Sequence, residues 1–169
     1  MVPKLTRVAV LAKSGNPGNA GVVKNVQAVA PKPGIGIVEC SAASVAEIDA
    51  AFARMAKEKA GAVIVLGDGF FVQQRRQIGA HPAAHRLPSL GAYATLAVAG
   101  VLMTYGVDSI DNFRRLATHV SKILKGALPA DLPVELPTRV ELAINGKTAK
   151  ALGLTLRQSL PISAGRVIE

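Results

Sequence analysis

The chain has 169 residues, enough for one ordinary domain with a substantial buried core. Half of the residues are hydrophobic but only 4% are aromatic, and Gly and Pro recur between apolar runs, which excludes a disordered chain and predicts a core of Ala, Val, Leu and Ile. The formal net charge of +9 is spread evenly, with eleven basic and six acidic side chains in residues 1–110 and nine and five in residues 111–169, so it argues against nucleic-acid binding.

The N-terminal residues and the cysteine content say little about the compartment. Residues 1–4 run directly into a strand-like segment without the charged, apolar and small-residue regions of a secretory signal, so we expect no signal peptide. The richest apolar run, residues 96–103, is far shorter than the roughly 18 residues that span a bilayer. Cys40 is the only cysteine, which excludes an intrachain disulfide and a multi-cysteine metal site.

The first half of the chain alternates strand-like and helix-like segments. Residues 7–12 form a β-branched run that ends in turn-forming residues at 13–19. We expect the next elements to be a helix over 20–30, a strand over 35–40, and a helix over 45–59 that opens with the capping-box residues Ser44 and Glu47.

The run AVIVL at residues 62–66 predicts a central parallel strand, because no polar residue interrupts it. We then expect a helix over 70–80, strands over 88–93 and 101–105 around a short Ala-rich helical piece, and a helix over 110–125 that Gly126 ends. This alternation predicts an α/β fold with a doubly wound parallel sheet, since each parallel crossover needs a connection that a helix provides.

The last 43 residues, 127–169, depart from the alternation of strands and helices. Three prolines within 128–137 predict an extended connector, followed by a strand over 138–144, a short helix over 147–152 and an irregular tail. A lone strand and helix bury little surface by themselves. We therefore expect this C-terminal extension to pack on residues 1–126 or on another chain.

Motifs for catalysis, nucleotides and metals all fall short of their required form. The run NGKT at 145–148 resembles the end of a phosphate-binding loop, but Glu141 stands where that loop requires glycine. His81 and His85 lie four residues apart, but Pro82 between them and the missing third ligand argue against zinc. We therefore expect no enzyme activity, no metal and no cofactor.

Polar and aromatic side chains gather where the predicted strands end. Ligands of open α/β sheets bind at the carboxyl ends of the strands. Acid groups there would pair with an amine and rings would supply contact area, which predicts a small polar ligand with an apolar or aromatic part. Taken singly, Asn16 and Asp68 also fit turn formation, and Phe70 also fits the core. The candidate ligand-binding residues are Ser14, Asn16, Asp68, Phe70, Tyr93 and Tyr105.

A series of short runs, in this order and spacing, carries a resemblance to a known family. They include NP at 16–17, LGD at 66–68, LMTYG at 102–106, KILKG at 122–126, PADLPVE at 129–135 and KTAKALGL at 147–154. With these runs, nearly the whole chain resembles the ABC-transporter substrate-binding protein family, which has a type I periplasmic-binding fold. The resemblance implies a lobe with a flavodoxin-like, three-layer arrangement.

Members of this family resemble two-lobed clamshells that capture a small solute, often an amino acid, and pass it to a membrane permease. The resemblance implies a solute-binding component located in the periplasm, with ABC permease subunits as partners. It covers the second lobe and the C-terminal return only, so we divide the chain into a ligand-binding lobe, 1–126, and a connector with extension, 127–169, that in the family returns to the first lobe. The alternative is a non-catalytic truncated module that forms a homodimer through residues 127–169.

Overall fold

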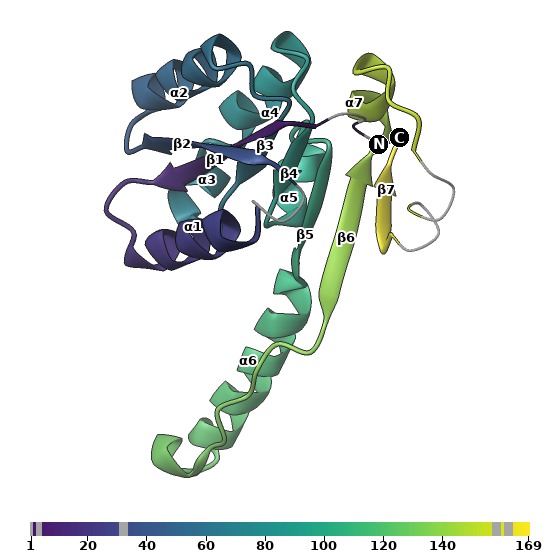
Figure 1. The fold of residues 1–169 in the computed structure, drawn as a ribbon. Helices are drawn as coiled ribbons and strands as arrows, with labels where there is room; N and C mark the ends of the chain where they lie inside the picture. Colours follow the sequence, from purple (N-terminus) through teal and green to yellow (C-terminus); the bar gives the residue numbers. More distant parts are fainter. Residues whose placement is uncertain (1, 3–4, 31–33, 157–159, 161–163) are drawn as a thin grey trace.

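The computed structural model describes residues 2, 5–30, 34–156, 160 and 164–169, and it is built on one seven-stranded sheet (Figure 1). The strands are β1 Arg7–Lys13, β2 Gly36–Ala42, β3 Ala62–Val65, β4 Ser89–Gly91, β5 Met103–Val107, β6 Val140–Asn145 and β7 Arg166–Ile168. The helices are α1 Pro17–Val29, α2 Val45–Lys57, α3 Gly69–Gln73, α4 Arg75–Ala84, α5 Ala94–Val98, α6 Ser109–Leu124 and α7 Gly146–Ala151, with a 3₁₀ turn at Pro129–Asp131.

The strand order is β2-β1-β3-β4-β5-β6-β7. The first five strands in this order are parallel, β6 runs antiparallel to β5, and β7 is parallel to β6. Because α1 covers one face of the sheet and the helices of the later crossovers cover the other, the arrangement is doubly wound. The predicted α/β fold with a mostly parallel sheet is confirmed.

Helices cover the two faces of the sheet unequally. The main core lies on the face that carries α2, α3, α4 and α5, where Leu11 and Val65 of the sheet pack against buried side chains of these helices. Those helical side chains are Ile48, Phe52, Met55, Phe71, Ile78 and Leu96. α1 lies on the opposite face, below the sheet in Figure 1.

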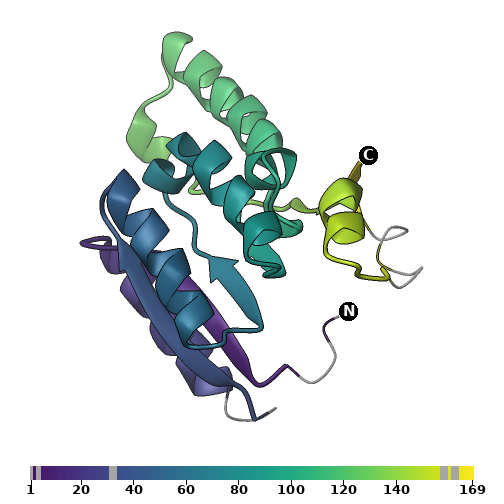
Figure 2. The same cartoon turned by 90° about the horizontal axis from the view of Figure 1, so that it is seen from above.

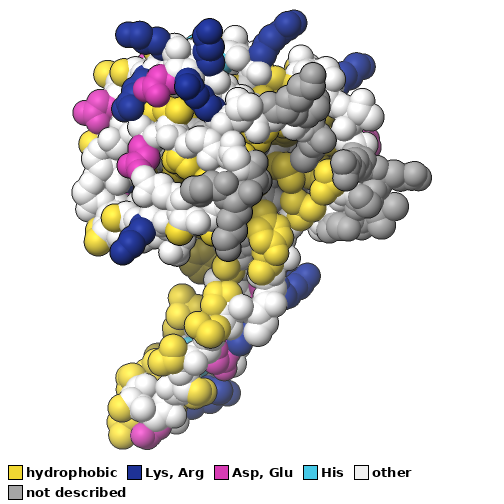
Figure 3. Space-filling model, in the orientation of Figure 1, with side chains coloured by type: hydrophobic (Ala, Val, Ile, Leu, Met, Phe, Trp, Pro, Cys, Tyr) yellow, Lys and Arg dark blue, Asp and Glu magenta, His cyan; other side chains and the backbone are white. Residues whose placement is uncertain are grey.

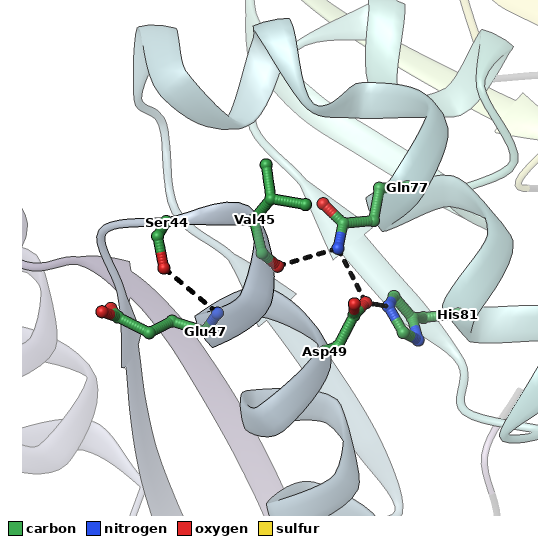
Figure 4. Close-up of polar contacts among 6 residues, drawn as sticks. All are labelled: Ser44, Val45, Glu47, Asp49, Gln77 and His81. Carbon is green, nitrogen blue, oxygen red and sulfur yellow. Dashed lines mark hydrogen bonds and ion pairs between the residues drawn. The ribbon is translucent and has the colours of Figure 1, made fainter.

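A polar network joins α2 to α4 (Figure 4). The amide of Gln77 donates to the carbonyl oxygen of Val45 at 2.9 Å and to Oδ1 of Asp49 at 2.7 Å. The ring of His81 lies 2.8 Å from the same Asp49 oxygen and stacks on Phe52, with ring centroids 4.2 Å apart. These contacts hold the outer layer of helices together.

Several element boundaries differ from the sequence prediction for local reasons. α1 begins at Pro17, not at residue 20, because Asn16 caps it and proline suits the first helical turn. The helix predicted over 70–80 is two helices, α3 and α4, that meet at Gln74. The strand predicted over 88–93 ends at Gly91, because Tyr93 is already the residue that precedes α5.

The C-terminal extension packs on the chain's own sheet. β6 pairs with β5 from Val140 to Ile144, and the side chains of Asn145 and Thr148 donate to the carbonyl oxygens of Ala97 and Gly100. The prediction of an irregular tail is wrong at Arg166–Ile168, which forms β7 because β6 offers it a free edge. The domain boundary after Gly126 stays a prediction.

α6 leaves the body of the molecule and has no buried residue (Figures 1 and 2). Apolar side chains recur along it at helical spacing, including Phe113, which is 71% exposed, and Figure 3 shows the hydrophobic surface of this projection. The connector after α6 runs back along it, where Arg115 bonds to Glu135 and Thr138. Among the described helices, none is long and apolar enough to cross a membrane.

Candidate functional site

The direction of the helical connections changes between β1 and β3, which are neighbours in the sheet. The chain leaves β1 toward α1 on one face, and it leaves β3 toward α3 on the other face. Such a switch point opens a crevice at the carboxyl ends of the two strands, where open α/β sheets bind their ligands. We call this place the β1/β3 switch.

Asn16 and Asp68 meet at the β1/β3 switch. Nδ2 of Asn16 donates to Oδ2 of Asp68 at 2.7 Å. Each side chain also caps its own helix: Oδ1 of Asn16 accepts from the Gly18 amide at 2.9 Å, and Oδ1 of Asp68 accepts from the Phe70 amide at 2.7 Å. The pair therefore fixes the starts of α1 and α3 relative to each other.

A third polar side chain, Asn19, makes a buried bridge beneath this pair. Its Oδ1 accepts from the Lys13 amide at 2.8 Å, and its Nδ2 donates to the Gly67 carbonyl oxygen at 3.2 Å. Asn19 thus ties the last residue of β1 to the loop after β3. The sequence indicates such a role for Asn19 only through its position in a turn-rich stretch after a strand.

The tyrosines border the same region. A Cβ added to Gly67 would lie 3.2 Å from the Tyr93 hydroxyl, so Tyr93 lies against the backbone beside Asp68. Tyr105 is 63% exposed and shares with Asn16 a hollow of about 400 Å³ over β3, β4 and the start of α1. Ser14 is exposed in the turn after β1, where its amide donates to the Ala42 carbonyl oxygen.

The structure also brings Lys13 and Phe70 together, and Lys13 is a residue that sequence reasoning missed. The Lys13 ammonium lies 5.5 Å from the centroid of the half-buried Phe70 ring and donates to the Ser14 carbonyl oxygen at 3.0 Å. Its position as the last residue of β1 is the signal that would have found it. The switch therefore combines a cation, an aromatic face, amides and hydroxyls, which suits binding of a small polar molecule.

The described residues show neither a metal centre nor a catalytic set. In this part of the chain, no group of three or more His, Cys, Asp or Glu side chains is arranged to hold a metal ion. His81 and His85 stack on each other with ring centroids 5.4 Å apart, and both stack on Phe52. No described histidine or carboxylate bonds to Ser14, so the geometry supplies no activated nucleophile.

Comparison with protein families decides what the chain is. The model of the family described as ABC transporter substrate binding protein matches residues 1–168. The chain belongs to this family. No curated protein is a significant match to its sequence.

Solved structures show the same fold in longer chains. One is an ABC domain in complex with L-Trp from Streptococcus pneumonia, with 25% identity, a TM-score of 0.88, and coverage of 99% of this chain and 57% of that one. A conserved domain protein from Vibrio cholerae has 23% identity and a TM-score of 0.87, with coverages of 98% and 56%. A ligand-free, open substrate binding protein with adhesive properties from Clostridium difficile has 18% identity and a TM-score of 0.72, with coverages of 99% and 56%. The chain thus spans little more than half the length of these proteins.

Proposed function

We propose that this chain is the ligand-binding lobe of a solute-binding component of an ABC transporter. It binds a small solute, such as an amino acid, at the β1/β3 switch and has no catalytic role. The observation that carries the proposal is the hydrogen bond between Asn16 and Asp68, which draws the loops after β1 and β3 together at the place where this fold binds ligands.

The candidate site comprises the residues expected from the sequence, which come from the ends of β1, β3 and β5 and from the loop after β4. Ser14 and Asn16 come from the loop after β1, and Asp68 and Phe70 come from the start of α3. Tyr93 directly precedes α5, and Tyr105 lies in β5. Family membership supports ABC permease subunits as partners and a periplasmic location. Membership and the relative in complex with L-Trp together support an amino acid as the solute and make L-Trp the first one to test.

A thermal-shift screen of the full chain against amino acids and small carboxylates tests this function. A solute that binds only the folded chain must raise the melting temperature, by an amount that grows with its concentration above Kd. We expect at least one member of the panel to do so. If none stabilises the chain at millimolar concentration, this lobe does not bind a solute by itself, and the proposal fails for this chain.

A second candidate is association with another copy of the chain, and exposed apolar side chains favour it. In addition to Phe113 on α6, the connector exposes Leu128, Val134 and Leu136 within the predicted dimerisation segment 127–169. Contiguous exposed apolar surface marks an interaction site on a soluble protein. Light scattering over a range of protein concentrations tests this candidate, and a strict monomer at every concentration would exclude it.

A further inference from the structure

The carboxylates at the carboxyl edge of the sheet accept hydrogen bonds at the starts of the helices that follow the strands. Oδ1 of Asp108 accepts from the amides of Ile110 and Asp111 at 3.0 and 3.1 Å, as Asp68 accepts from Phe70 and Asn16. A ligand amine would have to compete with these helix caps, each of which already satisfies backbone donors that have no other partner.

Glu47 shows the same arrangement after β2. Its Oε2 accepts from the Ala43 amide at 2.6 Å. The Ser44 hydroxyl accepts from the Glu47 amide at 3.3 Å, as Figure 4 shows. The carboxylates after β2, β3 and β5 therefore serve the starts of α2, α3 and α6. Their charges offset the positive ends of these helices.

Lys13, at the end of β1, has no charged partner among the described residues. Its ammonium donates to one carbonyl oxygen, that of Ser14, and no carboxylate of the described residues lies within 4.0 Å of it. An ammonium group has three donors, so two remain for a ligand. The Phe70 ring beneath the ammonium keeps it at the β1/β3 switch, because the face of an aromatic ring attracts a cation.

We propose that the solute carries a carboxylate that binds the Lys13 ammonium, with its apolar or aromatic part lying against Phe70 and Tyr93. This inference rests on the proposed function and names the chemical class of its solute. The net charge of +9 also favours binding of a carboxylate, because it attracts anions to the chain. The loss of one hydrogen bond between charged groups weakens the binding of a ligand by about tenfold or more.

The test compares three indole probes that differ in charge: indole-3-propionate, its neutral amide indole-3-propanamide, and the cationic tryptamine. The chain has no tryptophan, so the fluorescence of the indole reports binding to the full chain directly. We expect the propionate to bind at least about tenfold more tightly than the amide. We expect tryptamine to bind more weakly than both, because the basic surface repels it.

Three variants assign the preference to Lys13. Lys13→Met keeps the aliphatic stem and removes the charge, and we expect it to abolish the preference for the propionate over the amide. Lys13→Arg keeps the charge and should keep the preference, as should Lys57→Met at the far end of α2. Thermal unfolding of each variant shows that it is folded.

The possible outcomes separate this inference from the proposed function. If the amide or tryptamine binds as tightly as the propionate, or if Lys13→Met keeps the preference, the solute is not held by its anionic group and this inference is wrong, while solute binding stands. If a solute from the amino-acid screen binds and the indole-3-propionate does not, a carboxylate with an aromatic part is not sufficient for binding, and this inference is wrong while solute binding stands. If no probe and no member of the screen binds, the proposed function fails, and this inference fails with it.

Discussion

Nδ2 of Asn16 donates a 2.7 Å hydrogen bond to Oδ2 of Asp68 across the β1/β3 switch, although the two residues lie 52 positions apart. Asp68→Ala removes this bond and the cap of α3, so we expect it to lower the free energy of unfolding by about 1–3 kcal/mol. Asp68→Asn should cost less, because asparagine caps helices nearly as well as aspartate does. Urea unfolding measures both changes. Asp131→Ala, in the exposed 3₁₀ turn, is the control, and an equal effect there would remove any special role for Asp68.

Two glycines should respond to the same substitution in opposite directions. A Cβ at Gly106 would lie 2.0 Å from the Ala92 carbonyl oxygen, so Gly106→Ala must displace backbone and should cost at least about 2 kcal/mol. A Cβ at Gly21, inside α1, meets nothing within 4 Å, so Gly21→Ala should raise the free energy of unfolding by about 0.5–1 kcal/mol. Urea unfolding of both variants checks this, and a stable Gly106→Ala protein would contradict the close approach of the two segments.

The fold was largely predictable because its signals are local. The apolar run in β3 and the capping box before α2 mark these elements within a few residues. β7 was missed because three residues are too few to show alternation, and only the edge of β6 makes them a strand. At the site, Asn16 and Asp68 could be predicted because each follows the end of a predicted strand. Their contact with each other could not be predicted, because it depends on β1 and β3 being neighbours in the sheet, and the pattern of one strand does not show its neighbours.

The Asp49 carboxylate makes one contact of the outer helical layer sensitive to pH. Hydrogen bonds from Gln77 and His81 lower the pKa of Asp49 below its ordinary value of 3.8. A carboxyl whose pKa is depressed in the folded state stabilises that state above its unfolded pKa and loses this effect as the pH falls through its folded pKa. We therefore expect the difference in unfolding free energy between wild type and Asp49→Asn to be constant above about pH 5 and to shrink below about pH 4.

Chemical denaturation between about pH 2.5 and 6 measures this difference. Asp131→Asn provides the matched control, because the Asp131 carboxylate bonds to no described side chain. A difference that grows as the pH falls would show that the hydrogen bonds to Gln77 and His81 do not favour the charged form of Asp49.

The exposure of α6 predicts a substitution without effect on the stability of the isolated chain. Phe113→Ser removes a large apolar side chain that is 71% exposed, so the free energy of unfolding should stay within about 0.5 kcal/mol of wild type. Leu96→Ala in α5, which opens a cavity in the core, should cost about 2–5 kcal/mol. If Phe113→Ser were as destabilising as Leu96→Ala, α6 would be packed against another surface in solution.

Amide chemical-shift mapping tests the central claim, that the β1/β3 switch is where this lobe binds its solute. The full chain, labelled with ¹⁵N, is titrated with the best solute of the thermal-shift screen. We expect the largest shifts on residues 13–16, 67–70 and 92–95, around Asn16, Asp68 and Tyr93. Shifts confined to the apolar hollow of about 440 Å³ beneath α1, lined by Val26, Val29 and Ile37, would contradict it.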